Sequence, residues 1–509
     1  MNLFCMLQTK DYFHFRVNDI EFKGYQKANN ALPGDTVQWN GYSCELIQRK
    51  KHIITGTVEL ASKTKYGITA KGHVMYLFVP FDKSYPSMTV GSSHKDCSKN
   101  YIGVAEFDSW ERVLPRANLI RLLGPCGDFE VEAHAILLTY HPYKMPKMIE
   151  LEPESTDFMN REICPEQTFN IDPKGCVDID DALSIRGNQI WITIADVAER
   201  VSHKSPIDTF ASIQGQTVYR NGTIVLPMLP EQLSEYMCSL HPGEFKPGVS
   251  LVLTCTEHPF TIQSTCWKLT AIRNVKSYDY DTFIEKARKD GINTRFIQSI
   301  AEYILGVSTD DPHKWIEAFM LKYNMETAKI LKMTGQGILR KHSGADEEKW
   351  KLYSQWGLEA LASASAEYCD TNDPSPNHIG LGKNVYCHAT SPIRRYADLV
   401  NQRILKTYID GSIPGIEKIN IDWLNQRQKN GKRYERDIFF LENLGKGILD
   451  ATVINVKTEK LKLWIPSWKR IISWKTDTKI EIGSNIKLDY FVNQNSRNWK
   501  ERIVYRLVE

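Results

Sequence analysis

The chain has 509 residues, of which 42% are hydrophobic and 25% charged, and its net charge is +3 at neutral pH. This length predicts several domains or one large core with appended modules, and the composition is that of an ordinary soluble globular protein. No apolar run is long enough for a membrane span, and the N-terminus lacks the layout of a signal peptide. We therefore expect no membrane partner and a location in the cytoplasm or another reducing intracellular compartment. The 11 cysteines form no CxxC pair, which predicts free buried thiols rather than disulfides or a zinc site.

The first 145 residues or so predict short strands broken by turns. Alternating or aromatic-rich runs lie at residues 12–17, 36–39, 52–60 and 74–80, and Asn40-Gly41 is typical of a hairpin turn. Many short strands with regular turns indicate two small barrels joined near residue 50. Such barrels either bind nucleic acid or serve as structural domains. Residues 146–168 are rich in Pro and Glu and predict a linker or an extended arm.

Four aspartates then fall within ten residues, and this stretch is the first candidate site. They are Asp172, Asp178, Asp180 and Asp181, and Pro173 and Gly175 predict a turn between the first two. Carboxylates this close repel one another unless they are solvated, neutralised by a basic group or bound to a shared cation. Hard oxygen ligands on a tight turn suit Mg²⁺. A solvated acidic loop is the alternative, whereas a calcium loop is excluded because Val177 and Leu183 replace its glycine and glutamate.

The pattern changes to helices from about residue 281 to 450 and returns to strands afterwards. Apolar residues with helical spacing include Trp315, Phe319 and Tyr323, and also Leu358, Leu361 and Ala364. Four or five strands from residue 446 onward predict one more small barrel. Residues 401–509 carry 21 Lys/Arg against 13 Asp/Glu, with interleaved Trp and Tyr. This basic part indicates either a nucleic-acid-binding module or a solvated basic surface.

The second candidate site is the run from His388 to Asp398, which reads HATSPIRRYAD. Ser391-Pro392 predicts a helix start, so Arg394 and Arg395 would lie on its first turn, about 100° apart. Guanidinium groups and helix N-terminal amides both suit phosphate oxygens. An arginine pair held by Asp398 or by other acidic neighbours is the alternative.

Together the two sites resemble the signatures of the ribonuclease II/ribonuclease R family of 3′→5′ exoribonucleases, which includes the catalytic subunit of the eukaryotic exosome. Further family-like pieces lie between them in order, and include Pro227-Met228-Leu229-Pro230 and Cys238-Ser239-Leu240. The resemblance covers residues 165–445 firmly and the flanks through their layout. It implies an α+β catalytic core flanked by all-β barrels of OB type: a cold-shock-like barrel at 1–50, a second at 51–147, the catalytic domain at 148–446, and a C-terminal RNA-binding barrel at 447–509.

The resemblance also implies roles for single residues. Asp172, Asp178, Asp180 and Asp181 would hold two Mg²⁺ ions, with Mn²⁺ as a substitute; Asp172 and Asp181 are the first choice for direct ligands. Asp180 and Arg394 would be catalytic, with Arg394 on the scissile phosphate and Arg395 beside it. Tyr219 and Tyr280 would contact the 3′-terminal nucleotides, although Tyr278 is an alternative to Tyr280 in register. Glu317 and Glu435 would contact the substrate as well.

This sequence departs from the family pattern in three places. The segment between Tyr280 and Trp315 is short, so the aromatic residue that would stack on the far side of the terminal bases has no assignment. Gln402 stands where many members have histidine. We expect no nuclease domain ahead of the barrels and no basic tail behind the last one. The missing aromatic residue leaves the length of the end product open.

The expected activity is processive, magnesium-dependent 3′→5′ degradation of single-stranded RNA to nucleoside 5′-monophosphates. We expect a monomer, and association with a larger RNA-decay complex stays open. A catalytically inactive RNA-binding relative is the first alternative. An array of OB barrels that acts as a nucleic-acid chaperone, with a structural magnesium site, is the second.

Overall fold

The computed structural model describes residues 5–142, 158, 160–257, 260–412, 419–445, 447–457, 460–492 and 503–508. The chain divides into two compact units. The first unit comprises Met1–Pro142 and Lys432–Glu509, and the second comprises Tyr143–Gly431. The division falls within one helix, α9 (Ile421–Glu442). Most of the predicted linker at 146–168 lies outside the described residues.

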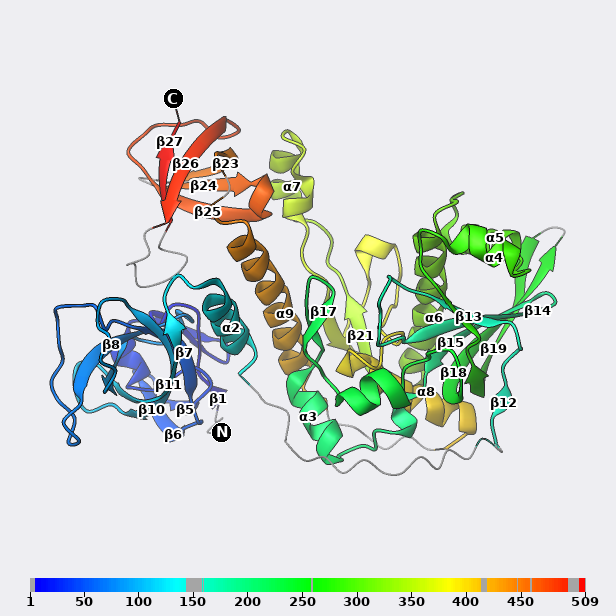
Figure 1. Ribbon diagram of the computed structural model, residues 1–509, viewed down its shortest axis with the longest axis horizontal. Helices are drawn as coiled ribbons and strands as arrows, with labels where there is room; N and C mark the ends of the chain where they lie inside the picture. Colours follow the sequence, from blue (N-terminus) through cyan, green and yellow to red (C-terminus); the bar gives the residue numbers. More distant parts are fainter. Residues whose placement is uncertain are drawn as a thin grey trace. The chain divides into compact units, whose positions relative to one another are not determined.

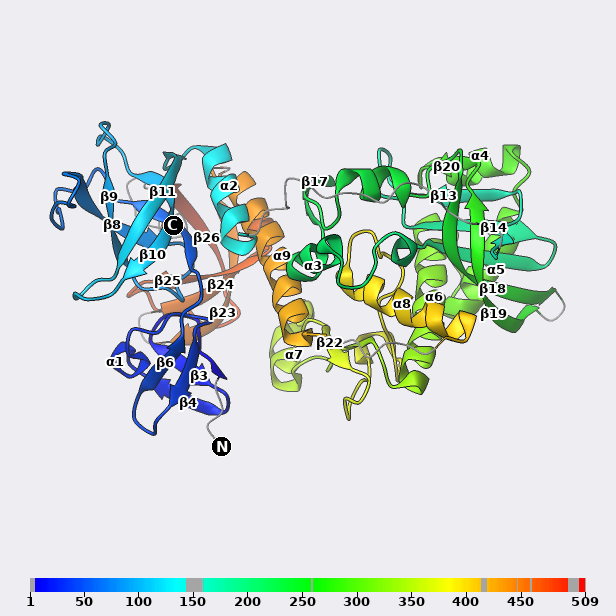
Figure 2. The same ribbon diagram turned by 90° about the horizontal axis from the view of Figure 1, so that it is seen from below.

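Two three-stranded sheets form the beginning of the first unit (Figure 2). One sheet pairs β1 (Cys5–Met6), β5 (Thr36–Trp39) and β6 (Cys44–Gln48); the other pairs β2 (Gln8–Thr9), β3 (His14–Val17) and β4 (Ile20–Lys23). A short helix, α1 (Tyr25–Ala28), follows β4. The rings of Phe15 and Phe22 stack at 5.3 Å in the core between these elements. Alternation of buried and exposed residues along β3 is the period of two that the sequence predicts.

A closed five-stranded barrel follows, in the strand order β10-β11-β9-β8-β7. Its strands are β7 (Ile53–Val58), β8 (Val74–Pro80), β9 (Met88–Ser92), β10 (Tyr101–Ser109) and β11 (Arg116–Pro125). Gly56 allows the close approach of β7 and β8, because a Cβ there would lie 2.4 Å from the carbonyl oxygen of Val79. Helix α2 (Phe129–Tyr140) comes next, and the carboxylate of Asp128 caps it by accepting a 3.0 Å hydrogen bond from the Val131 amide.

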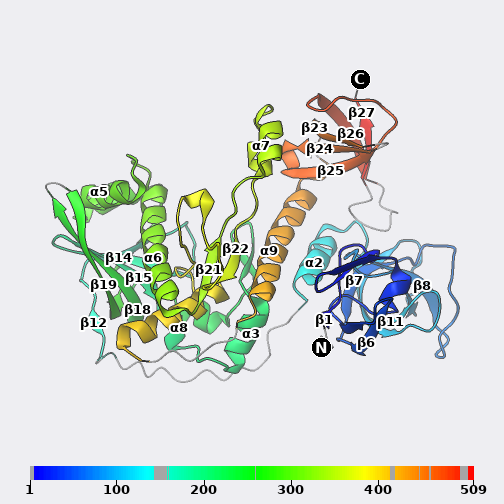
Figure 3. The same ribbon diagram turned by 180° about the vertical axis from the view of Figure 1, so that it is seen from behind.

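The C-terminal strands of the first unit form a five-stranded sheet in the order β25-β24-β23-β26-β27 (Figure 3). They are β23 (Leu449–Lys457), β24 (Lys460–Ile465), β25 (Arg470–Lys475), β26 (Asn485–Val492) and β27 (Ile503–Leu507). Trp468 is 1% exposed and packs edge-on against Phe440 of α9 at 4.7 Å. Within the described residues this sheet is open, so the strands of the predicted barrel are present without its closure.

A seven-stranded sheet organises the second unit, in the order β12-β19-β18-β15-β14-β13-β20 (Figure 1). Its strands are β12 (Glu162–Ile163), β13 (Thr168–Ile171), β14 (Asp181–Arg186), β15 (Gln189–Ala195), β18 (Phe245–Glu257), β19 (Phe260–Arg273) and β20 (Lys276–Tyr278). Residues 190–195 of β15 are buried throughout, as the continuous apolar run there predicts for a central strand. β13 pairs with β14 in antiparallel and with β20 in parallel orientation, which sets the geometry of the aspartate loop.

Helices and short strands complete this unit. The helices are α3 (Pro206–Gln214), α4 (Phe283–Lys289), α5 (Thr294–Leu305), α6 (Pro312–Thr334), α7 (Glu347–Ser354), α8 (Tyr396–Asp410) and the start of α9. Two two-stranded antiparallel sheets add β16 (Val218–Arg220) with β17 (Thr223–Leu226), and β21 (Ile338–Lys341) with β22 (Glu367–Asp370). Figure 1 shows α6 and α8 beside the long strands β18 and β19. The fold is therefore multidomain, with an α+β core and β-rich modules, as the resemblance implies.

Some local expectations are wrong. The helical spacing of Leu358, Leu361 and Ala364 yields only a 3₁₀ turn, Glu359–Ala362, because Gly357 adopts a left-handed φ of 67° before it and Ser363 is extended after it. All 11 cysteines are free, but Cys97 and Cys266 are exposed rather than buried.

Among the described residues, no helix is both long enough and apolar enough to cross a bilayer.

Candidate active site

The four aspartates lie at one end of the β13–β14 pair. Asp172 follows β13, Asp181 begins β14, and residues 173–180 connect the two strands. The loop is tied to the sheet at both ends: the Asp172 amide donates to the carbonyl of Tyr278 at 3.0 Å, and the Ala195 amide donates to the carbonyl of Asp180 at 2.8 Å. Because β13 and β20 are parallel neighbours, Asp172 and the residues after Tyr278 leave the sheet at the same edge.

A second contact set holds the middle of this loop. The hydroxyl of Ser239 accepts a hydrogen bond from the Ile179 amide and donates one to the carbonyl of Val177, both at 2.9 Å. The Leu240 amide donates to the carbonyl of Ile179 at 3.0 Å. Ser239 is fully buried. The Cys238-Ser239-Leu240 piece, which the sequence marks only as family-like, thus fixes the backbone between Asp178 and Asp180.

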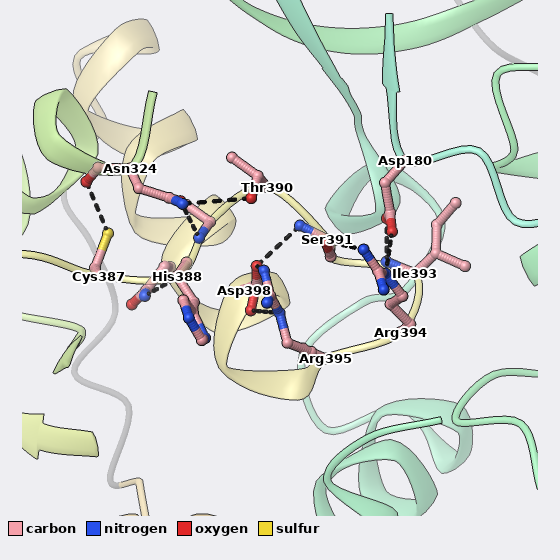
Figure 4. A network of polar contacts seen from close by, with 12 residues as sticks. Asp180, Asn324, Cys387, His388, Thr390, Ser391, Ile393, Arg394, Arg395 and Asp398 are labelled. Atoms are coloured by element: carbon pink, nitrogen blue, oxygen red, sulfur yellow. Dashed lines mark hydrogen bonds and ion pairs between the residues drawn. The ribbon is translucent and has the colours of Figure 1, made fainter. Parts of the chain in front are cut away.

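Asp180 meets Arg394 across more than 200 residues of chain (Figure 4). One carboxylate oxygen accepts from the Ile393 amide at 3.0 Å, and the other accepts from Nε of Arg394 at 3.1 Å. Nη2 of Arg394 donates to the hydroxyl of Ser391 at 3.1 Å. Asp180 is 3% exposed, whereas 47% of the Arg394 side chain is exposed. The structure therefore brings the two predicted catalytic residues into direct contact.

The paired arginines do not lie on a helical turn, so that expectation is wrong. Ser391 to Arg394 form a turn, and Arg395 is the extended N-cap residue of α8 with φ −134° and ψ 124°. Backbone pairing with the segment after α3 imposes this shape: the Thr217 amide donates to the Arg394 carbonyl at 2.9 Å, and Gln216 bridges to Arg395. Arg395 then turns to Asp398, which accepts from its Nε at 2.9 Å and from its Nη2 at 2.7 Å.

Helix α6 supports the segment before the arginines. The side-chain oxygen of Asn324 accepts a hydrogen bond from the Ala389 amide at 2.8 Å, and its amide group donates to Tyr386 at 3.0 Å and to Thr390 at 3.4 Å. The thiol of Cys387 donates to the backbone carbonyl of Asn324 at 3.2 Å (Figure 4). This buried asparagine therefore fixes the second signature against the helical layer.

Two predicted tyrosines lie near the aspartates. The hydroxyl of Tyr219 on β16 donates a hydrogen bond to Asp178. Tyr280 follows β20, and burial together with the charges of Asp181 and Asp172 raises its pKa. Its ring stacks on that of His313 at 3.7 Å between centroids and 12° between planes. Tyr278, the alternative in register, is instead 4% exposed and donates to Asp290 at 2.6 Å, so Tyr280 is the tyrosine beside the acidic loop.

The other residues that the sequence singles out are Glu317, Glu435 and Gln402. Glu317 is exposed on α6 and pairs with Lys314 at 2.7 Å, one turn after His313. Glu435 is exposed on the part of α9 that belongs to the first unit, whereas the aspartates belong to the second. Gln402, where family members often have histidine, is buried: its amide group donates to the Ala195 carbonyl at 2.7 Å, and its oxygen accepts from the Ala198 amide at 3.0 Å. Gln402 thus links α8 to the end of β15.

Burial and mutual repulsion dominate the electrostatics of the acidic loop. Burial raises the pKa of Asp180 to about 7, although Arg394 and the Ile393 amide oppose this shift. Desolvation raises the pKa of Asp181 well above its usual range, and the charges of Asp172 and Asp180 add to it. The pKa of Asp172 is raised by desolvation too, while its hydrogen bond from Asn170 and the charge of Arg394 act against the shift. Three carboxylates thus share the positive charge of one guanidinium.

The donor set fits a divalent cation in its chemistry. As the side chains stand, no three His, Cys, Asp or Glu groups within the described ranges are arranged to hold a metal ion. Magnesium sites, however, take only one or two carboxylates and complete their shell with waters and substrate phosphates. Asp181 has a strongly raised pKa, and no hydrogen bond to its carboxylate contributes to that shift. A partly desolvated carboxylate that receives no hydrogen bond from the part of the chain that the structure describes is the kind of group that a cation would neutralise.

Sequence reasoning did not assign three supporting residues: Asn170, Ser239 and Ser391. Asn170 is 1% exposed, donates to Asp172 at 2.8 Å and accepts from Asn274 at 2.7 Å and from Ser277 at 2.6 Å. Ser391 holds Arg394 through its hydroxyl and Asp398 through its amide, the latter at 2.9 Å. Asn170 and Ser391 lie next to or inside the two signatures, and Ser239 lies in a family-like piece between them; this is the sequence signal, because a buried polar side chain needs a partner.

Comparison with known proteins agrees with this arrangement. The RNB domain model matches residues 160–305 and 285–411, and the Dis3-like cold-shock domain 2 model matches residues 75–141. The exosome complex exonuclease RRP44 of Mus musculus is 25% identical over an alignment that covers 72% of this chain and 48% of the relative. Exoribonuclease 2 of Aeromonas hydrophila is 25% identical, with 64% of this chain and 61% of the relative covered. The chain spans about half the length of the RRP44 relatives it matches.

Solved structures show the same fold over nearly the whole chain. Mycoplasma genitalium RNase R in complex with ribose-methylated single-stranded RNA superposes with a TM-score of 0.76 at 17% identity, covering 99% of this chain and 100% of that chain. Yeast Ssd1, described as a pseudonuclease, superposes with a TM-score of 0.70 at 17% identity over 95% of this chain and 80% of that chain. Fold and site together define a protein with an RNB-type core that follows cold-shock-like modules in the sequence. The chain belongs to the ribonuclease II/ribonuclease R family.

Proposed function

We propose that this protein is a magnesium-dependent 3′→5′ exoribonuclease that degrades single-stranded RNA processively and releases nucleoside 5′-monophosphates. One observation carries the proposal: all four signature aspartates are present, and Arg394 contacts Asp180 although the two residues lie far apart in sequence. The exonuclease names of relatives such as RRP44 and exoribonuclease 2 support the same activity. The RNA complex of the Mycoplasma genitalium RNase R supports RNA as the substrate class.

Asp172, Asp178, Asp180 and Asp181 are the residues that would hold Mg²⁺ ions. When bound, two such ions would stabilise the charge on the attacking and leaving oxygens of a phosphodiester. Arg394 uses Nε for Asp180 and one N–H of Nη2 for Ser391, so its other N–H groups are available to phosphate oxygens. A fixed guanidinium at that point stabilises the negative charge that develops on the phosphate.

Three further side chains orient this centre. Asn170 and Tyr219 each donate a hydrogen bond to one aspartate, Asp172 and Asp178 respectively, which limits the rotation of those carboxylates. Tyr280 presents a ring beside the same aspartates, and base stacking on such a ring binds RNA without sequence preference. Selectivity for RNA over DNA would require a contact to the 2′-hydroxyl group. Glu317 remains a candidate for a substrate contact on α6.

The test is incubation of the protein with 5′-labelled single-stranded RNA, with and without Mg²⁺. The proposal predicts that, with Mg²⁺, the full-length label disappears and a short 5′-labelled end product accumulates with few intermediates, and that the RNA does not react in chelator. Unchanged RNA in the presence of Mg²⁺ or Mn²⁺ would overturn it. That result would favour the second candidate, an RNA-binding relative without activity, for which the likeness to the yeast Ssd1 pseudonuclease is the supporting observation.

The described parts of the first unit suggest where RNA approaches. Lys460 and Lys475 lie directly opposite each other on β24 and β25, and both are exposed. Like charges at this spacing destabilise a sheet unless an anion binds between them. We propose that this face of the C-terminal sheet binds the RNA backbone. Association with a larger RNA-decay complex is a further proposal, supported by the exosome names of the RRP44 relatives.

A further inference from the structure

A cavity of about 420 Å³ lies in the second unit, and none of the four aspartates or Arg394 lines it. Its walls come from the segment before α3, from α3 itself, from Tyr396 at the start of α8 and from Trp423 on α9. This volume falls within the range of small-molecule sites. The activity proposed above makes no use of the cavity.

Among the described residues that line the cavity, the accessible charge is positive. Asp208 is the acidic lining residue, but it is 3% exposed and its carboxylate accepts from the Tyr396 hydroxyl at 3.0 Å, from Arg403 at 2.7 Å and from the Lys204 amide at 2.7 Å. His203 also lies 3.5 Å from it. The ammonium group of Lys204 makes no ion pair with the described residues and is exposed at the rim. An anionic group would therefore find a lysine and a histidine there.

The opposite side of the lining is aromatic. The indole N–H of Trp423 donates to the carbonyls of Ser212 and Ile213 at 3.2 and 3.1 Å, which fixes the ring against the end of α3. The Arg427 guanidinium lies 5.6 Å from the ring centroid. The ring remains partly exposed and lines the cavity. A fixed and partly exposed indole is a suitable surface for stacking a planar base.

We propose that this cavity binds a nucleoside 5′-monophosphate, with the base against Trp423 and the phosphate at Lys204 and His203. The choice of ligand rests on the proposed function, because that reaction releases such nucleotides. A phosphate carries the negative charge that the rim lacks, and the volume of the cavity suits a single nucleotide rather than a strand.

The cavity is connected to Arg394 through backbone contacts. Helix α3 runs directly into the segment Gly215–Thr217 that pairs with the arginines. The Tyr396 amide donates to the Gly215 carbonyl at 3.0 Å, and the Thr217 amide donates to the Arg394 carbonyl at 2.9 Å. Gly215 is tightly packed, since a Cβ at this position would lie 2.8 Å from Cβ of Arg427. A nucleotide against α3 and Tyr396 would thus bias the position of Arg394, and product would slow hydrolysis from a site separate from the RNA.

Calorimetric titration of 5′-AMP into the full chain tests the proposal. We expect saturable binding that Lys204→Ala weakens about tenfold, the effect of losing one charge-assisted contact. Lys351→Ala on α7 is the matched control, because it also removes an exposed lysine of the second unit, and it should bind 5′-AMP as the wild type does. No saturable binding at millimolar nucleotide, or equal binding by Lys204→Ala and the wild type, would overturn the proposal.

A second readout separates this proposal from the activity itself. Lys204→Ala should degrade RNA at the wild-type rate without added nucleotide but should lose its inhibition by 5′-AMP, and Trp423→Phe should keep partial inhibition. If RNA stays intact in every case, the proposed function fails, while 5′-AMP binding remains measurable by calorimetry. If RNA is degraded and 5′-AMP inhibits Lys204→Ala as strongly as the wild type, the cavity proposal alone fails.

Discussion

Two arginines that are adjacent in the chain contact aspartates in opposite ways (Figure 4). Arg395 binds the fully buried Asp398 through two N–H groups, at 2.9 and 2.7 Å, within one turn of the same helix. Arg394 contacts Asp180 through Nε alone at 3.1 Å, and 47% of its side chain is exposed. Arg395 and Asp398 neutralise each other one to one, whereas Arg394 faces a surplus of carboxylates. The Arg395–Asp398 pair therefore stabilises the fold, whereas the Arg394–Asp180 pair, with its exposed guanidinium, can bind a ligand.

The largest expected effect comes from removing the negative charge of Asp180, the partner of Arg394. Asp180→Asn should abolish hydrolysis and leave RNA affinity at or above the wild-type value, because asparagine keeps the side-chain volume and the acceptor for the Ile393 amide but lowers the negative charge. Single-turnover degradation and RNA titration measure the two quantities. Asp310→Asn, an exposed aspartate of the same unit, is the control and should behave as the wild type. Near-normal turnover of Asp180→Asn would show that the loop is not the metal site.

Exchanging each arginine for lysine sharpens the comparison. Arg394→Lys should lower the single-turnover rate by about 10²–10³, the typical cost of one charge-stabilising donor. Lysine keeps the charge but lacks the planar guanidinium fork, whose N–H groups point in fixed directions toward Asp180, Ser391 and a phosphate. Arg395→Lys should lower the rate much less, because its partner Asp398 lies in the fold rather than in the acidic loop. RNA affinity should change little in either variant. Equal rates, or a slower Arg395 variant, would reverse the assignment of the two arginines.

The free energy of unfolding should depend more on the Arg395–Asp398 pair than on the Arg394–Asp180 pair. Asp398→Asn leaves Arg395 without its carboxylate and should lower the free energy of unfolding by about 3–5 kcal/mol, the usual result of breaking a buried pair by removing one partner. Asp180→Asn should change it far less, because burial already raises the pKa of Asp180 to about 7 and its charge is poorly stabilised. Urea unfolding of both variants measures the difference. Equal losses of stability would mean that both pairs serve the fold.

The smallest expected effect comes from removing two positive charges of the C-terminal sheet. Replacing Lys460 and Lys475 with alanine should reduce the salt dependence of RNA binding by about 1.4 in the log–log slope, since each phosphate contact to a single strand contributes about 0.7. Activity on short RNA under saturating conditions should persist. The measurement is RNA affinity at several salt concentrations, with Lys27→Ala as a control on α1. An unchanged slope would show that this face does not contact RNA.

Short-range patterns were enough to predict most of the elements near the site. The apolar run of β15 and the turn residues around Asp172 lie where the sequence places a strand and a turn. The start of α8 could not be predicted, because Ser391-Pro392 has the local chemistry of a helix start. Pairing of Gln216 with Arg395 delays the helix to Tyr396. A contact between residues nearly 180 positions apart leaves no mark in the local sequence.

In the candidate site, too, the local sequence predicts residue types but not their tertiary contacts. The four aspartates and Arg394 were predictable as residue types with a spacing, and the structure adds the contact between Asp180 and Arg394. Asn170, Ser239 and Ser391 had no assignment because their roles depend on which carboxylate or amide lies opposite. The local sequence could not distinguish Tyr278 from Tyr280, because the two differ in tertiary contacts: Tyr278 is buried and donates to Asp290, whereas Tyr280 lies near Asp172 and Asp181.

The central claim is that the acidic loop has too little positive charge of its own and binds divalent cations. Titration of Mn²⁺ into the full chain, followed by electron paramagnetic resonance of the free ion, tests this claim directly. We predict saturable binding by the wild type, clearly weaker binding by Asp181→Asn, and wild-type binding by the control Asp310→Asn. Equal Mn²⁺ affinity in all three proteins, or no saturable binding by any of them, would contradict the account.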